Sequence, residues 1–295
     1  MTETAQEVLA HWKLPIPVSL SALLIAFFYL RGWRRLRQGS SNVIPAWRAA
    51  SFVAGLSLIW LAIASPLAHL DEISLTVHML QHLLLMTIAP ALMLMGVPVM
   101  PLLHGLPQGF VQTVLGPVLR WPAIQATGRF LSQPALCWLA AAAALAGWHI
   151  PAVFNLAMQS EGWHVVEHSS FIAAGFLFWW PVIQPWPSVP VWPRWTMILY
   201  LFAATLPCDI LSAYLTFCER VVYPAYLGSP RLFGLSALED QECAGALMWT
   251  CVTVIFLVPA AGIAISLLAP NAGAGALSNV GLTKGGSSSP KTYRG

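Results

Sequence analysis

Charged residues are scarce in this sequence: Asp, Glu, Lys and Arg together make up 8% of its 295 residues. Ordinary soluble domains carry about 25% charged residues, so most of this protein's surface is expected to face something other than water. The formal net charge is only +3, and there is no basic stripe with interleaved aromatic residues. The sequence therefore excludes a nucleic-acid-binding protein, and the lack of a Walker or Rossmann loop argues against nucleotide binding.

Cysteines and the common catalytic motifs are equally sparse. The five cysteines, Cys137, Cys208, Cys218, Cys243 and Cys251, show no CxxC spacing. An odd number of cysteines, mostly inside apolar stretches, does not describe a disulfide scaffold, although one bridge between Cys218 and Cys243 stays open. Neither HExxH nor GxSxG occurs, so zinc proteolysis and serine hydrolysis are not indicated.

Long apolar runs dominate the sequence, in which 58% of the residues are hydrophobic. A helix of about 20 apolar residues crosses the ~30 Å hydrocarbon core of a bilayer. The runs predict an all-α, polytopic membrane protein, with seven transmembrane helices forming one domain over residues 1–268. The predicted spans are residues 15–30, 46–64, 73–97, 134–158, 163–183, 195–217 and 241–268.

Other stretches are expected to lie outside the spans. The segment Pro98–Gln133 is punctuated by Pro and Gly, which predicts a loop with short interfacial helices. Residues 269–295 are rich in Gly and Ser and are expected to form a disordered cytoplasmic tail. The N-terminus has no basic region before its first apolar run, so a cleavable signal peptide is not predicted.

The few positive charges predict how the bundle is oriented. With seven spans, eleven of the fourteen Lys and Arg residues fall on one side, and without the tail the ratio is still eight to three. Positive residues favour the cytoplasmic side, so the N-terminus is predicted outside and the C-terminus in the cytoplasm. The eleven are Arg31, Arg34, Arg35, Arg37, Arg48, Arg120, Arg129, Arg194, Lys284, Lys291 and Arg294.

Several spans contain ionisable residues, which are costly inside a membrane and usually functional. The third and fifth spans each carry two histidines four residues apart, a spacing that puts both imidazoles on one helix face. Further polar or soft side chains occur in the other spans. The pairs are His78/His82 and His164/His168, and the further residues are His149, Cys208, Asp209, Asp240, Gln241 and Met248.

The depth of these residues suggests that they meet. At a rise of 1.5 Å per residue, the predicted orientation places His78 and His168 about 7 Å in from the outer ends of their helices. The deeper residues, His82 and His149 among them, come out at roughly 10–14 Å by the same arithmetic. Five helices thus present polar or soft ligands in one outer layer, which favours a shared site.

The ligand types narrow the choice of metal. Imidazole suits zinc, copper, iron and nickel, whereas thioether and thiolate groups shift the preference toward copper(I). A histidine-rich set with Met248 and Cys208 within reach favours copper, while the carboxylates of Asp209 and Asp240 leave iron and zinc open. The plainer interpretation is that each histidine forms an interhelical hydrogen bond. For His149, taken by itself, the hydrogen-bond interpretation is favoured. The two matched pairs, His78/His82 and His164/His168, favour binding of a metal or haem.

Several segments, in order and with similar spacing, resemble a known family. They are VHMLQHLLLMTIAPALMLMGVPV, GWHIPAVFNLA, WHVVEHSSFIAAGFLFWWPVI, LPCDILSAYLTF with YPAY, and EDQECAGALMW. From about residue 46 to residue 268 the sequence resembles the CtaG-like cytochrome c oxidase assembly family of bacterial seven-span membrane proteins. The resemblance implies a location in the bacterial inner (plasma) membrane and a role in supplying or installing copper in the oxidase.

Residue chemistry and resemblance together give the working hypothesis of a copper carrier without catalytic activity. The protein is expected to hold copper(I) transiently in an outer-leaflet site and to pass it to a cytochrome c oxidase subunit, with a periplasmic copper chaperone as a candidate donor. The predicted ligands are His78, His82, His149, His164, His168 and Met248, supported by Cys208, Asp209, Asp240 and Gln241. Two alternatives stay open: a redox protein that binds haem or iron through the same histidines, and a copper transporter.

Overall fold

The structure, a computed structural model, describes residue 12 and residues 14–39, 44–188 and 192–269. These residues form helices and connecting loops, with no strand among them. The predicted tail from residue 270 onward lies outside the described residues. The long helical segments are α2 (Ile16–Gly39), α3 (Ala46–Ala64), α4 (Leu75–Leu83) continued by η2 (Leu84–Ile88) and α5 (Ala89–Met95), α10 (Pro134–Trp148), α12 (Glu161–Ile183), α13 (Thr196–Phe217) and α14 (Ala237–Leu268).

Five of these segments are long and apolar enough to cross a membrane: Ile16–Gln38, Ala46–Ala64, Leu75–Met95, Thr196–Phe217 and Ala237–Leu268. A sixth is added if α9 (Pro122–Leu131) and α10, which meet at a bend of 67°, form one span. The protein is therefore a polytopic helical membrane protein. The count of seven spans and the orientation of the termini stay predictions.

The predicted span over residues 134–158 is divided into two helices. Helix α10 ends at Trp148, and a separate helix, α11 (Pro151–Gln159), follows. Pro151 has no N–H to donate to a preceding turn, and it pushes the residue before it out of the helical conformation. Ile150 accordingly has φ −65° and ψ 123°, so the chain turns just after His149.

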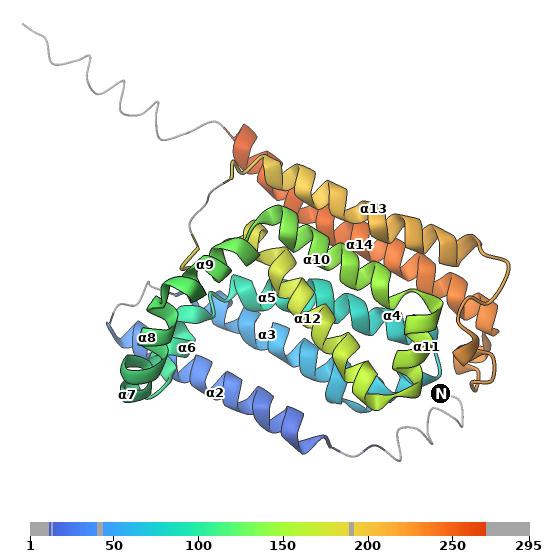
Figure 1. The fold of residues 1–295 in the computed structure, drawn as a ribbon, viewed down its shortest axis with the longest axis horizontal. Coiled ribbons are helices and arrows are strands. Elements are labelled where there is room, and N and C mark those ends of the chain that lie inside the picture. Colours follow the sequence, from blue (N-terminus) through green and yellow to red (C-terminus); the bar gives the residue numbers. More distant parts are fainter. Residues whose placement is uncertain (1–11, 13, 40–43, 189–191, 270–295) are drawn as a thin grey trace, which may run out of the picture.

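The connection after α5 is a series of short helices, as the Pro and Gly pattern predicts. Figure 1 shows these helices gathered at one end of the bundle, where α2 also ends. A Cβ on Gly32 of α2 would overlap the carbonyl oxygen of Pro101, so the glycine allows α2 and α6 to approach closely. The short helices are α6 (Val99–Gly105), α7 (Gln108–Phe110), η3 (Val111–Leu115), α8 (Gly116–Arg120) and α9.

The core lies between the long helices, and their outer faces remain apolar. Helices α13 and α14 pack along each other, and α14 also contacts α4 (Figure 1). Phe202, Ile210 and Phe217 of α13 are 65%, 72% and 73% exposed, as expected of side chains that face lipid. The loops opposite the short helices contain η1 (Pro66–Glu72), η4 (Pro224–Tyr226) and η5 (Leu232–Gly234).

Candidate metal centre

The start of helix α4 is fixed by Asp240 of α14. Asp240 Oδ2 accepts a hydrogen bond from the backbone N–H of Leu75 (2.6 Å), and Oδ1 accepts one from the Ser74 hydroxyl (2.9 Å). Ser74 is itself the N-cap of α4, so two otherwise unpaired donors at the helix start are satisfied. The contact with Asp240 fixes the start of α4, which lies about one helical turn before His78.

His78 and His82 lie on the face of α4 that is turned toward α12. Both side chains are buried, with 0% and 5% exposure, and their ring centroids are 4.3 Å apart. Directly after His82 the chain forms one turn of π-helix, η2. Single π turns inside α-helices are frequent at functional sites, and here the turn follows the histidine pair.

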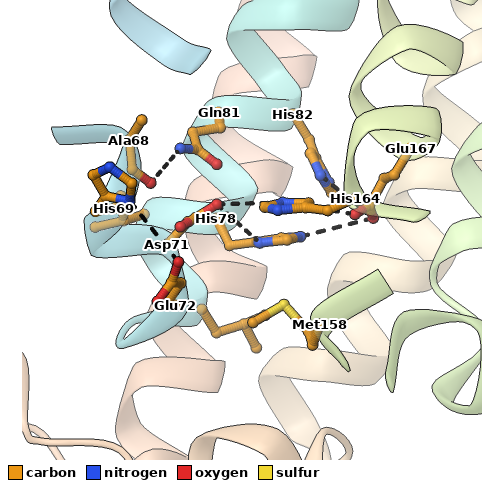
Figure 2. Close-up of polar contacts among 12 residues, drawn as sticks. Ala68, His69, Asp71, Glu72, His78, Gln81, His82, Met158, His164 and Glu167 are labelled. Carbon is orange, nitrogen blue, oxygen red and sulfur yellow. Dashed lines mark hydrogen bonds and ion pairs between the residues drawn. The ribbon is translucent and has the colours of Figure 1, made fainter. Parts of the chain in front are cut away.

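Helices α12 and η1 complete a cluster around these histidines, which Figure 2 shows in close-up. Helix α12 contributes His164 and Glu167, and η1 contributes Asp71. Glu167 and Asp71 are 0% and 3% exposed. We call Asp71, His78, His82, His164 and Glu167 the His–carboxylate cluster.

The donor atoms of the His–carboxylate cluster form two groups of three that share His78. In the first, Asp71 Oδ2 lies 3.9 Å from His78 Nδ1 and 3.3 Å from His164 Nε2. In the second, Glu167 Oε1 lies 3.8 Å from His78 Nε2 and 3.5 Å from His82 Nε2. The opposite ring nitrogens of His78 therefore face the two carboxylates.

These separations suit metal coordination better than hydrogen bonding. Hydrogen bonds between such atoms are about 2.7–3.2 Å long, whereas ligands about 2.0 Å from a tetrahedral ion lie about 3.3 Å from one another. Among the described residues, both ring nitrogens of His78 and of His82, His164 Nε2 and both carboxylate oxygens of Glu167 are buried without a hydrogen-bond partner. Buried polar atoms normally have partners, and a cation between them would satisfy this set.

The pKa of the Asp71 carboxyl follows from its buried position in η1, just before α4. Burial raises the pKa of its carboxyl to about 7, and the negative charge of neighbouring Glu72 adds to the effect. The Asp71 backbone carbonyl accepts a hydrogen bond of 2.9 Å from the hydroxyl of Tyr226. A bound cation would favour the charged carboxylate and so would release a proton from a protonated Asp71.

Sequence reasoning did not select the two carboxylates of the cluster. Glu167 lies three residues after His164 and one before His168, so the i, i+3 spacing on one helix face was the available signal. Asp71 lies outside α4, and only the folded η1 brings it beside His78. Gln81, also not selected, donates hydrogen bonds to the carbonyls of Ala62 and Ala68 at 3.0 and 2.9 Å.

Three of the sequence-predicted site residues lie beside the cluster and not in it. His149, Cys208 and Met248 line a separate cavity, which also contains His82. The Nδ1 atom of His149 lies 2.7 Å from the carbonyl oxygen of Leu145, and its Nε2 lies 3.2 Å from the sulfur of Met79.

The remaining predicted residues have other surroundings. The ring of His168 lies 4.2 Å from that of His164, but His168 belongs to neither group of three. Gln241 is fully buried and accepts a hydrogen bond from the N–H of Val222. It donates to the carbonyls of Leu215 in α13 and Arg220 in the α13–α14 connection. Asp209 is half-buried on α13, belongs to neither group, and its Oδ1 has no hydrogen-bond partner in the part of the chain described here.

Fold and site together define a multi-pass helical membrane protein with a buried His–carboxylate cluster between its helices. The sequence model of the cytochrome c oxidase caa3 assembly factor family, Caa3_CtaG, matches residues 27–269. The chain belongs to this family, as the sequence motifs predicted. It is therefore a multi-pass protein of the bacterial inner membrane.

More distant similarity extends to mycobacterial proteins. Uncharacterized proteins of Mycobacterium leprae and Mycobacterium bovis are 22% and 24% identical over 250 residues, which is 84% of this chain. An uncharacterized protein of Mycobacterium tuberculosis is also 24% identical over the same share. The chain spans only 38% of the length of these relatives. No solved structure matches the chain.

Proposed function

We propose that this protein is a cytochrome c oxidase assembly factor, a non-catalytic carrier that holds copper in the His–carboxylate cluster and passes it to the oxidase. The observation that carries the proposal is the convergence of buried, unpartnered imidazole and carboxylate atoms on shared points. Imidazole binds copper well, and the family assembles a copper-containing oxidase.

The ligand arrangement suits a transient cargo. Each group of three leaves a coordination position open, in contrast to the closed four-ligand cages of structural metal sites. Because His78 belongs to both groups, an ion can exchange one set of partners for the other. An incoming ligand from the oxidase or from a donor protein can then occupy the open position.

The cluster has a route to the surface. His164, whose side chain is 24% exposed, lines a hollow of about 650 Å³ that also includes the exposed Glu72 and Glu161. These carboxylates favour approach of a cation. If the predicted orientation holds, the hollow opens on the outer side of the membrane, where a periplasmic copper chaperone and the oxidase copper centres would meet it.

A second candidate function, a redox protein holding iron, is supported by the two carboxylates of Asp71 and Glu167, since carboxylate and imidazole also suit iron. Haem is less favoured, because the rings of His78 and His82 touch edge to face at 4.3 Å, leaving no slot for a macrocycle between them. An absorption spectrum and metal analysis of the purified protein distinguish iron and haem from copper.

The copper proposal is tested with the double substitution His78→Ala and His82→Ala. We expect copper(II) bound by the purified variant to fall to background, and oxidase copper content in cells to fall with it. His104→Ala is the matched control, because His104 is exposed on α6 and its ring contacts only the carbonyl of Met100 in the same helix in the described structure. Full copper stoichiometry in the double variant, or a fully metallated oxidase in cells lacking the protein, would contradict the proposal.

A further inference from the structure

Next to His82 the helices line a cavity of about 50 Å³, whose wall does not include Glu167. Most of its wall is aliphatic or aromatic, and besides Thr87 and Trp138 it includes two histidines and four sulfur-containing residues. These are His82, His149, Met79, Met86, Cys208 and Met248. The cavity thus combines an apolar wall with the donor types that bind soft metal ions.

The contact between His149 and Met79 is the unusual feature of this wall. A backbone carbonyl can only accept a hydrogen bond, so the 2.7 Å contact with Leu145 places the proton of a neutral His149 ring on Nδ1. The Nε2 atom then carries a lone pair, and it faces a thioether sulfur at 3.2 Å, which also has only lone pairs to offer. His149 is 6% and Met79 0% exposed, so bulk water does not relieve this contact.

A soft cation would satisfy both lone pairs. Metal–nitrogen bonds are about 2.0 Å and metal–sulfur bonds about 2.3 Å long for the d¹⁰ ion zinc. With these bond lengths, an ion bound to both atoms would have an N–metal–S angle of roughly 95°. Met248, 3% exposed, and Cys208, also 3% exposed, supply further sulfur on the same cavity wall.

We propose that this cavity is a second metal position, selective for copper(I), with His149 Nε2 and Met79 Sδ as its primary ligands. The inference rests on the proposed function in taking copper as the cargo. The two positions differ in charge as well as softness. The cavity offers neutral nitrogen and thioether ligands in an apolar wall, which suit a soft monovalent ion, whereas the cluster offers two carboxylates, which suit a divalent one.

His82 connects the two positions. Its Nε2 lies 3.5 Å from Glu167 Oε1 in the cluster, its ring centroid lies 6.1 Å from that of His149, and its side chain lines the cavity. Rotation of this one imidazole would offer a nitrogen to either side. A copper(I) ion can therefore pass from the cavity to the histidines of the cluster without a change of oxidation state.

The test compares copper(I) and zinc(II) binding to the purified full-length protein under anaerobic, reducing conditions. Met79→Leu removes the sulfur and nearly conserves volume. We expect its copper(I) dissociation constant, from competition with a chromogenic chelator, to rise about tenfold or more, with zinc(II) binding unchanged. Met93→Leu is the matched control, because Met93 is also buried but lies outside the cavity wall.

X-ray absorption at the copper edge supplies the second measurement. We expect sulfur scattering around copper(I) in the wild type and its weakening in Met79→Leu. A copper(I) shell of nitrogen and oxygen alone, or an unchanged dissociation constant in a folded Met79→Leu variant, would overturn the second position and leave the cluster proposal standing. Loss of copper binding by His164→Ala with Glu167→Gln, while Met79→Leu binds normally, would also overturn it.

A different result would show that the proposed function is wrong while the second metal position is right. If copper(I) binds in the cavity with sulfur scattering, yet the oxidase acquires its copper normally in cells lacking the protein, delivery is wrong and the binding position is supported.

Discussion

At the scale of single residues, Glu167 holds the His–carboxylate cluster together. Its Oε1 faces His78 and His82, and its Oε2 lies 3.9 Å from His164. The side chain is fully buried, without a hydrogen-bond partner among the described residues. A buried carboxylate that faces three imidazoles gains most from a cation placed between them.

Glu167→Gln is therefore expected to weaken metal binding while preserving the shape of the side chain. Loss of the negative charge should raise the dissociation constant for zinc(II) or copper(II) about 10- to 100-fold, as measured by calorimetry on the purified protein. Glu219→Gln is the control, because Glu219 is exposed in the α13–α14 connection and belongs to neither group of three. Equal affinities of the two variants would refute the central role of Glu167.

At the scale of elements, the cluster depends on how closely α12 approaches the π turn η2. A Cβ built on Gly175 of α12 would overlap the carbonyl oxygen of Met86 and lie 2.8 Å from Pro90 Cγ. Met86 and Pro90 belong to the continuous segment formed by α4, η2 and α5, which also carries His78 and His82. Gly175 therefore permits the separation at which α12 can place Glu167 beside these histidines.

Gly175→Ala is expected to push α12 away from η2. Overpacking of this kind costs about 1–3 kcal/mol, so thermal unfolding in detergent should begin at a lower temperature and metal affinity should fall as well. Gly147→Ala on α10 is the matched control, because a Cβ there meets nothing within 4 Å. A Gly175→Ala protein with wild-type stability and affinity would show that the close contact does not position the cluster.

At the scale of the whole molecule, most of the described arginines lie at one end of the bundle, whereas Arg220 and Arg231 lie in the α13–α14 connection. Helix α2 ends near α6–α9 (Figure 1), and Arg35 donates a hydrogen bond of 3.0 Å to the carbonyl of His104 in α6. The hollow beside His164 contains Glu72 and Glu161 instead. The positive-inside tendency predicts that the α6–α9 end is cytoplasmic and the hollow periplasmic.

Cysteine labelling tests this orientation. In a background in which the native cysteines are replaced, Ser229→Cys, in the α13–α14 connection, should react with a membrane-impermeant maleimide added to spheroplasts. Gln125→Cys, in the exposed helix α9, should react only after lysis. The reverse pattern would invert the predicted orientation and place the cluster near the cytoplasmic side.

Much of the architecture is encoded locally and is therefore readable from the sequence. Hydropathy located the long apolar helices, and Pro and Gly predicted the short helices after α5. The pairs His78/His82 and His164/His168 share helix faces because four residues make about one helical turn. Each of these features depends on residues close together in the chain.

The sequence by itself thus determined the helical membrane fold, the family and the histidines that face the bundle interior. Only the tertiary structure decided which side chains meet: Glu167 and Asp71 complete the cluster, His149 faces Met79, and Asp240 caps α4. Partners across helices depend on the rotation, crossing angle and separation of whole helices, which are set by packing over many distant residues. Local periodicity gives the face on which a residue lies, and packing decides what that face touches.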